Sequence, residues 1–214
     1  EGRLNYALTV DTVQNASLKF YGTKVSGAAA KDSISFSAIT QDQKATDWFR
    51  VSADMYQKDE AFNFKLKDTL LLNYEDWSVA PDNFISYGND GLLINNFLIQ
   101  SDTASISARS QQPVANSPVD IKVDNFNLQS ISSLISGDTL FASGILDANV
   151  LLSELDKSFP AFTGDASVSN LVVMLQPVGD IKASAGKFGN DLITAKAALT
   201  GYGNDVVLDG NYFL

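Results

Sequence analysis

The chain has 214 residues, of which 45% are hydrophobic, and its 15 basic and 25 acidic residues give a net charge of −10. It contains no cysteine and no histidine, which excludes thiol nucleophiles, disulfides, Ser-His-Asp triads and nearly all zinc, haem and iron–sulfur sites. The acidic balance argues against binding nucleic acid or an anionic bilayer by charge attraction. We therefore expect no nucleic-acid partner, no metal site and no cofactor.

No segment of the sequence is apolar enough to span a membrane as a helix. The longest wholly apolar run is Leu171–Leu175, far short of the roughly 20 residues that a membrane helix needs. The chain begins Glu1-Gly2-Arg3, without a start methionine or signal peptide. We expect it to be a segment of a longer protein, with any export signal or anchor outside it.

The first half of the chain has the pattern of successive β-strands. Apolar residues fall on every second position, and Gly, Asn and Asp cluster between the runs. A period of two predicts half-buried strands with one dry face and one wet face. The predicted strands of this half are Leu4–Val10, Ala16–Phe20, Ser33–Ala38, Thr46–Tyr56, Phe62–Leu66, Leu70–Tyr74, Trp77–Val79, Leu92–Ile99 and Ala104–Ala108.

A segment with two prolines, Ser110–Pro118, divides the chain into candidate units 1–110 and 119–214. The strand pattern resumes at once with Val119, Ile121 and Val123. The segment is therefore a domain boundary or a long loop rather than a flexible linker.

One short helix is predicted over residues 128–136. Asn127 is a suitable N-cap, and Gly137 is a suitable stop. Leu128, Ile131 and Ile135 form an apolar stripe at helical spacing. We expect this stripe to cover an open end or edge of the sheet.

The last part of the chain has the clearest alternation. Its strand 193–199 carries Ile193, Ala195, Ala197 and Leu199 on one face, and the polar Thr194 and Lys196 lie opposite. A turn rich in Gly, Asn and Asp leads to a second alternating run, 206–214. Two such runs joined by a short turn predict a hairpin.

Two similar turns suggest an internal repeat. Tyr87-Gly88-Asn89-Asp90 and Phe188-Gly189-Asn190-Asp191 are each followed by a strand, a turn and another strand. A repeat of this kind favours an architecture that grows by adding strands. The alternative is that the tetrapeptide is ordinary turn sequence.

The remaining side chains with catalytic potential are explained by turns. Asp82, Asp90, Asp191 and Asp205 all lie in predicted turns beside Gly or Asn, where Asp is favoured because it bonds the backbone. We assign no catalytic residue and expect that the protein is not an enzyme.

The strand pattern is compatible with two folds. In a closed β-sandwich, two apolar faces bury each other. In an open, curved sheet, a long apolar groove would have to be filled by a ligand. The alternation of apolar and polar residues is compatible with both the closed sandwich and the open sheet.

Residues 119–214 resemble a known family. The matching features are the strand end Phe126-Asn127-Leu128, the helix leading to Gly137, a strand 141–150 with an internal glycine, the step Pro160–Val168 with Gly164, and the hairpin end Leu208-Asp209-Gly210. This layout is similar to TamB-type translocation and assembly module domains, which are AsmA-like envelope proteins of Gram-negative bacteria. The first half resembles the family only through the internal repeat.

The resemblance implies a fold, a function and partners. The fold would be an elongated, curved antiparallel sheet, or β-taco, with a hydrophobic groove. The function would be lipid transport in the periplasm and support of outer membrane biogenesis, without catalysis. The partners would be phospholipid acyl chains, an Omp85-family outer-membrane barrel protein and, through an anchor outside this segment, the inner membrane. The groove residues would be Val168, Val172, Ile193, Ala197, Leu199, Val206 and Leu208.

The rival hypothesis is a secreted β-sandwich module that binds carbohydrate or protein. Its platform would be the aromatic residues Trp48, Trp77 and Tyr87. The two hypotheses differ in structure, because a sandwich has two facing sheets and a lipid conduit has one curved sheet with an open apolar side.

Overall fold

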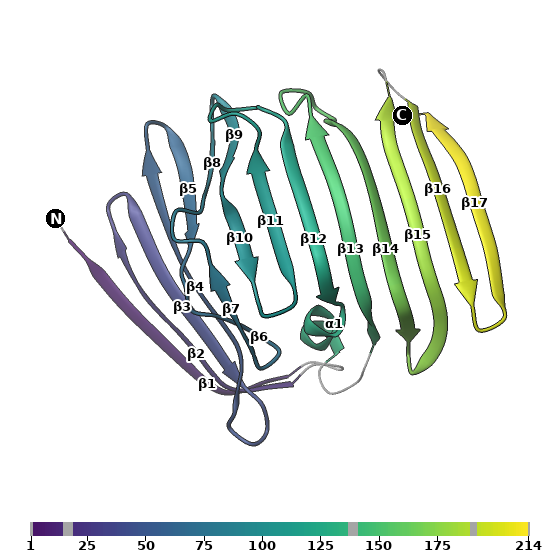
Figure 1. Ribbon diagram of the computed structural model, residues 1–214. Coiled ribbons are helices and arrows are strands. Elements are labelled where there is room, and N and C mark those ends of the chain that lie inside the picture. The colour runs from purple at the N-terminus through teal and green to yellow at the C-terminus, as the bar shows by residue number, and fades with distance from the viewer. Residues whose placement is uncertain (1, 15–18, 137–140, 189–191, 214) are drawn as a thin grey trace.

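The computed structural model describes residues 2–14, 19–136, 141–188 and 192–213, which form one large, open antiparallel sheet and one short helix (Figure 1). The first strands are β1 (Leu4–Gln14), β2 (Lys19–Ala30), β3 (Ser33–Gln41), β4 (Asp47–Lys58), β5 (Ala61–Leu66), β6 (Leu70–Leu72), β7 (Glu75–Val79), β8 (Phe84–Gly88) and β9 (Gly91–Asn95). The others are β10 (Phe97–Gln100), β11 (Ser105–Ser110), β12 (Val119–Asn127), β13 (Ala142–Ser153), β14 (Ala161–Val173), β15 (Gln176–Phe188), β16 (Leu192–Gly201) and β17 (Asn204–Phe213). The helix α1 spans Gln129–Ser136.

The strands pair in one continuous path from β1 to β17. The order is β1, β2, β3, β4, β6, β7, β10, and then β11 to β17 in sequence, and every pairing is antiparallel. A side branch of β5, β8 and β9 lies beside β4. The sheet crosses the loop 111–118 without a break, because Ser110 at the end of β11 pairs with Val119 at the start of β12.

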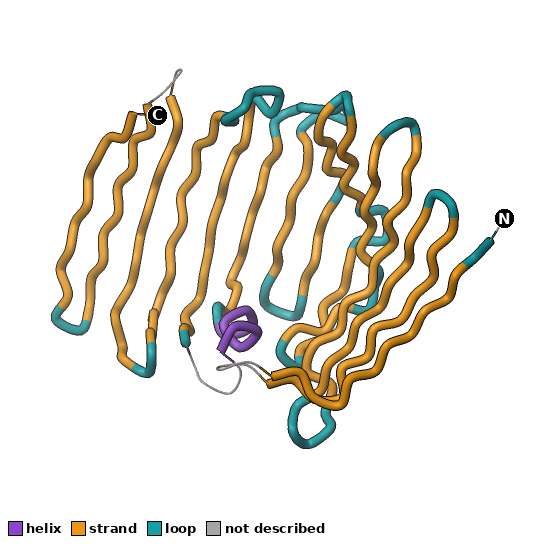
Figure 2. The backbone as a smooth tube through the Cα atoms, turned by 180° about the vertical axis from the view of Figure 1, so that it is seen from behind, coloured by secondary structure: helices purple, strands orange, loops and turns teal. Residues whose placement is uncertain are grey.

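The sheet is curved and does not close. The strands near the N-terminus form one wall, and β10 to β17 form the other, as the two opposite views show (Figures 1 and 2). This is the predicted open trough. It is not the closed sandwich that the alternation also allowed.

One face of the sheet, which we call the inner face, carries the apolar residue of most alternating pairs. It is defined by Ala53, Trp77, Ile99, Val123 and Leu208 and by the residues that alternate with them or pair with them across strands. The opposite, outer face carries most of the charged and polar side chains. The predicted faces of the strand 193–199 are confirmed by the observed pairing.

The hydrophobic core forms where the inner face curls onto itself. Its buried residues come from both walls: Ala53, Leu66, Leu70, Trp77, Val79, Ile99, Ala104 and Phe126. The ring centroids of Trp77 and Phe126 are 5.8 Å apart, and Phe126 is only 1% exposed. Burial of a side chain of this size contributes roughly 1.5–3 kcal/mol, so this cluster fixes the curvature of the sheet.

A buried asparagine joins the loop after β7 to the end of β5. Asn83 is 1% exposed. Its side-chain oxygen accepts a hydrogen bond from the Leu66 N–H at 2.9 Å, and its amide donates to the carbonyl oxygens of Leu66 at 2.9 Å and Ala80 at 2.6 Å. The side chain thereby satisfies backbone groups at the point where β5 ends.

The helix lies at one end of β12 (Figure 1), and its predicted cap is confirmed. The Asn127 side-chain oxygen accepts a hydrogen bond from the Gln129 N–H at 2.9 Å. The predicted stripe is wrong at Ile131, which is 47% exposed while Ser130 and Ser133 are buried, and Leu128 is half-buried. The small serines allow close packing against the sheet; the side chain of Ile135 and the predicted stop Gly137 lie outside the described residues.

The first half differs from the prediction in several places. The strand β2 continues to Ala30, well beyond the predicted strand Ala16–Phe20, of which residues 16–18 lie outside the described residues. The predicted strand Leu70–Tyr74 ends at Leu72, because Asn73 and Tyr74 have positive φ values of 52° and 69°. The predicted strand Leu92–Ile99 is divided into β9 and β10 at Asn96, whose φ of 42° breaks the extended conformation. The strand β8 was not predicted as a strand. Of the two similar turns, the one at Tyr87–Asp90 joins β8 and β9. Residues 189–191 of the other lie outside the described residues.

Candidate functional site

The inner face of β13 to β17 is a floor of small apolar residues bordered by larger ones. Strand pairing aligns side chains into rows that cross the strands at right angles. Two adjacent central rows are Ala148, Ala166, Ala183, Ala197 and Leu208, and Val150, Gly164, Ala185, Ala195 and Gly210. The larger row beside them is Leu146, Val168, Ile181, Leu199 and Val206. The rows form a shallow apolar surface that runs along the sheet.

This part of the inner face is partly exposed on β13 to β16 and most exposed on β17. Leu208 is 65% exposed, Tyr212 is 64% exposed and Val206 is 47% exposed. The same face is buried in the middle of the sheet, where Trp77 is only 3% exposed. Exposed apolar side chains that are contiguous in this way are the mark of a surface that meets another apolar partner.

Six of the seven predicted groove residues lie on this face. Strand pairing brings them together on β14, β16 and β17: Val168, Ile193, Ala197, Leu199, Val206 and Leu208. The seventh, Val172, lies near the end of β14 beyond two irregularities in the pairing, opposite Ser143 and Pro177. The structure therefore does not align Val172 with the other rows.

Sequence reasoning missed the part of the open face that lies near the N-terminus. On β1, Leu4 is 66% exposed and Leu8 is 59% exposed; on β3 and β4, Ile34 is 45% exposed and Met55 is 43% exposed. All four belong to the inner face. The same alternation marks these positions in the sequence, but the groove was assigned only to the second half.

A lysine interrupts the apolar face of β15. Lys187 pairs with Ile193 on the inner face and is only 8% exposed. Its ammonium group donates a hydrogen bond to the Phe159 carbonyl oxygen at 2.6 Å and lies 4.9 Å from the centre of the Phe159 ring. The charge is thus held against the loop that joins β13 to β14.

The outer face of β12 to β17 carries ion pairs between its own side chains. Lys196 forms an ion pair with Asp209 at 3.0 Å. Lys122 pairs with Asp124 at 2.7 Å, and its hydrogen bond lowers the pKa of Asp124. Such exposed pairs are typical of a solvated surface.

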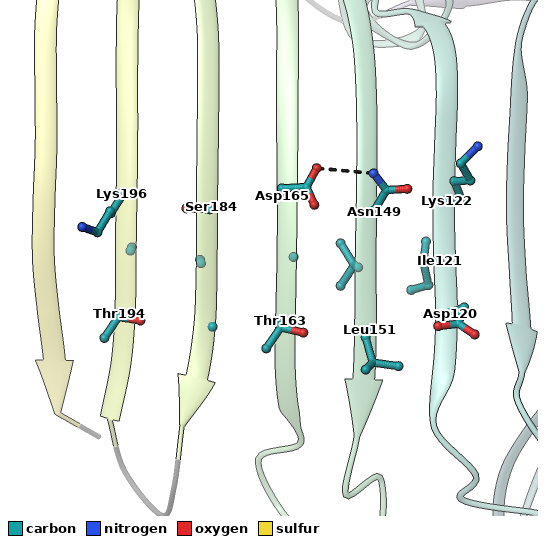
Figure 3. Close-up of a pocket in the computed structure, with 15 residues that line it drawn as sticks. Asp120, Ile121, Lys122, Asn149, Leu151, Thr163, Asp165, Ser184, Thr194 and Lys196 are labelled. Atoms are coloured by element: carbon teal, nitrogen blue, oxygen red, sulfur yellow. Dashed lines mark hydrogen bonds between the residues drawn. The ribbon is translucent and has the colours of Figure 1, made fainter.

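A depression of about 580 Å³ extends over β12 to β16, and most of its lining residues alternate onto the outer face. Asn149 donates a hydrogen bond to Asp165 at 3.3 Å across its middle (Figure 3). Thr163, Ser184 and Thr194 supply short polar side chains around this pair. Because the depression is open and its lining is largely polar, we place the candidate site on the inner face instead.

The two tryptophans do not belong to an exposed aromatic platform, as the rival hypothesis predicted, because both are buried. Trp48 is 4% exposed and Trp77 is 3% exposed. The Trp48 indole N–H donates to the Asn73 side-chain oxygen at 2.9 Å. Tyr87 is 65% exposed, but without the tryptophans it does not form a platform.

Within the described ranges, no three acidic side chains are grouped so that they could hold a metal ion, and no helix has the length and hydrophobicity to cross a membrane. No protein-family model, curated protein or solved structure matches the chain.

Proposed function

We propose that this chain is a non-enzymatic segment of a periplasmic envelope protein that conducts phospholipid along its apolar inner face. The observation that supports the proposal is the exposed apolar surface of β14 to β17, which ends in Leu208 and Tyr212 at more than half of their full exposure. Exposing this surface to water costs free energy, and an acyl chain laid on it would recover part of that cost.

The size of the open surface suits acyl chains. Neighbouring strands lie about 4.8 Å apart, so the rows from β13 to β17 extend for about 19 Å. One leaflet of a bilayer has a hydrocarbon thickness of about 15 Å. The small side chains of Ala183, Ala195 and Ala197 leave room above the floor, and each buried CH₂ group would contribute about 0.8 kcal/mol.

The transport would be passive. Acyl chains would slide along the rows of the inner face, and headgroups would remain in water at the open side of the trough. The wider role, in outer membrane biogenesis with an Omp85-family barrel and an inner-membrane anchor outside this segment, rests on the resemblance of residues 119–214 to TamB-type domains.

The first test is native mass spectrometry with lipid extraction of the protein purified from a Gram-negative host. We expect co-purified phospholipid in the wild type. Leu199→Asp and Leu208→Asp should each lose it, because a carboxylate on the inner face disfavours an acyl chain. Ala198→Asp is the matched control, because Ala198 pairs with Lys182 and Val207 on the outer face, and it should retain the lipid.

Circular dichroism must show that all three variants keep the fold. Folded protein with a lipid-free mass, together with no uptake of a fluorescent phospholipid, would overturn the proposal. Equal loss of lipid in Ala198→Asp would show that the charge, rather than the inner face, controls binding.

A further inference from the structure

We infer that Lys187 contacts the phosphate group of a lipid headgroup at the rim of the trough. The inference rests on the proposed function and adds to it a preference for lipids that contain phosphate. Among the charged residues of the described strands β13 to β16, Lys187 is the one that alternates onto the inner face. The others alternate onto the outer face: Asp147, Asp165, Asp180, Lys182 and Lys196.

Lys187 lies near the end of β15, where this strand reaches the rim of the sheet. The same rim carries the loop that joins β13 to β14, and α1 lies at the opposite rim (Figure 1). From Lys187 back along β15, the next inner-face residues are Ala185, Ala183 and Ile181. A strand rises about 3.3 Å per residue, so Ala183 lies about 13 Å from Lys187. A phosphate bound at Lys187 would therefore place its acyl chains over the floor of small residues.

The ammonium group of Lys187 is removed from water without being neutralised. The residue is only 8% exposed, and within the described ranges no acidic side chain forms an ion pair with it. The acidic Asp156 on the nearby loop pairs with Lys157 instead, at 3.7 Å, and both side chains are exposed. A buried charge is costly unless it is paired with an opposite charge. An anion bound beside Lys187 would offset this cost.

The contacts of Lys187 leave hydrogen-bond donors for an anion. An ammonium group has three N–H donors, and among the described residues its one acceptor is the Phe159 carbonyl oxygen, at 2.6 Å. The Phe159 ring, whose centre lies 4.9 Å from the ammonium nitrogen, helps to hold the side chain in place. A side chain that is already held loses less conformational freedom on binding. Its remaining N–H groups can form charge-assisted hydrogen bonds with phosphate oxygens.

The first test compares two lipids that differ only in the headgroup. Phosphatidylcholine and diacylglycerol with the same fluorescent acyl chain are titrated with the wild-type protein to give two dissociation constants. The phosphatidylcholine headgroup contains a phosphate and no hydrogen-bond donor, so it can accept a hydrogen bond from Lys187. We expect phosphatidylcholine to bind about tenfold more tightly, which corresponds to one hydrogen bond to a charged group.

Three variants assign this preference to one side chain. Lys187→Met removes the charge and should bind the two lipids equally, with the affinity for diacylglycerol unchanged. Lys187→Arg should keep most of the preference, because a guanidinium also bonds phosphate. Lys182→Met is the matched control, because Lys182 is exposed on the outer face of the same strand, and it should behave as the wild type. Circular dichroism checks the fold of each variant.

Failure of this inference can be told from failure of the proposed function. Equal binding of the two lipids by the wild type, or a retained preference in Lys187→Met, would overturn the inference and leave the lipid conduit standing. Binding of neither lipid by the wild type would overturn both. Loss of the preference in Lys182→Met would show that net charge controls it, and would also overturn the inference.

An excess of inorganic phosphate distinguishes a headgroup from a free anion. The acyl chains supply most of the affinity of a bound lipid, so free phosphate should leave the preference for phosphatidylcholine intact. Loss of the preference in excess phosphate would assign the site to free phosphate and overturn the headgroup contact.

Acetylation of the wild type decides the case if Lys187→Met does not fold. Phosphatidylcholine should slow the acetylation of Lys187 relative to that of Lys182, and diacylglycerol should not, as measured by mass spectrometry of peptides. Equal acetylation rates of Lys187 with the two lipids would overturn the inference.

Discussion

The middle of the sheet and its C-terminal part share one sequence pattern but differ in what covers the inner face. In the middle, Trp77 and Phe126 are 3% and 1% exposed, because the two walls of the trough meet there. On β17, Leu208 and Tyr212 are 65% and 64% exposed on the same face. Alternation therefore decides which face is apolar, but only the curl of the sheet decides whether that face becomes a core or a surface.

The difference also appears in the side chains. The closed part contains large aromatic residues that fill the space between the walls, such as Trp77 with Phe126. The open part has alanine and glycine in the central rows of β14 to β16. A core needs volume to fill it, whereas a groove for a ligand needs space. The composition of the two parts agrees with this distinction.

The largest expected effect comes from removing volume in the closed part. Phe126→Ala should lower the free energy of unfolding by about 3–5 kcal/mol, because it leaves a cavity in a packed core. Leu208→Ala, on the open part, should change it by less than about 0.5 kcal/mol. Urea denaturation of both variants measures the contrast, and similar losses at the two positions would contradict the division into closed and open parts.

The buried asparagine of the closed part should be nearly as sensitive. Asn83→Ala leaves the N–H and C=O of Leu66 without their side-chain partner, and each unpaired buried group costs about 1–3 kcal/mol. We expect the free energy of unfolding to fall by about 2–3 kcal/mol, the low end of the total for two such groups. Asn95→Ala is the control, because its exposed hydrogen bond reaches the neighbouring Asp82 carbonyl. An equal loss in the control would refute the role of burial.

Within the open part, two glycines should differ in how well they tolerate replacement by alanine. Gly179 has a φ of 121°, and an added Cβ would lie against the Thr200 carbonyl oxygen. Gly179→Ala should therefore cost about 1–2 kcal/mol. Gly210→Ala meets open space and should be neutral or slightly stabilising, since glycine is unfavourable within a strand. Thermal unfolding of the two variants gives the test.

The smallest expected effect is a loss of stability in acid. A hydrogen bond from Gln41 and the Arg50 guanidinium lower the pKa of Asp47, and the backbone N–H of Thr46 lowers the pKa of Asp42. A folded-state pKa below the unfolded value of about 3.9 stabilises the fold above that pH, and the contribution is lost as the pH falls through the folded value. The effect should be small because these carboxyl groups are exposed.

Asp47→Asn removes one of these contributions. Its melting temperature should therefore fall less steeply than that of the wild type when the pH is lowered from about 5 to 3. An identical slope in the two proteins would show that Asp47 does not contribute.

Much of the fold follows from local pattern, and most of the strands were predicted. The inner-face residues of 193–199, the Asn127 cap and the loop at 111–118 depend on alternation or on a few adjacent residues. These signals are local, so a single sequence is enough to read them.

The rest depends on contacts between distant residues. The burial of Trp77 arises from packing across the trough against Phe126, and Trp48 is buried against Phe20 and Tyr74, which are distant from it in the sequence. The exposure of Ile131 and the burial of Ser130 depend on how closely the helix approaches the sheet. The open face near the N-terminus, including Leu4 and Leu8, has the right alternation, but it could be assigned to the same groove only once the pairing path was known.

The central claim is that the open inner face of β17 carries acyl chains. The most direct measurement is photo-cross-linking in a Gram-negative host, with a photoreactive phenylalanine analogue placed at Leu208 on the inner face or at Val207 on the outer face. These neighbours are 65% and 72% exposed, so they differ mainly in the face they occupy. We predict that position 208 captures phospholipid and that position 207 does not. Equal capture at both positions, or capture only at 207, would contradict the proposed function.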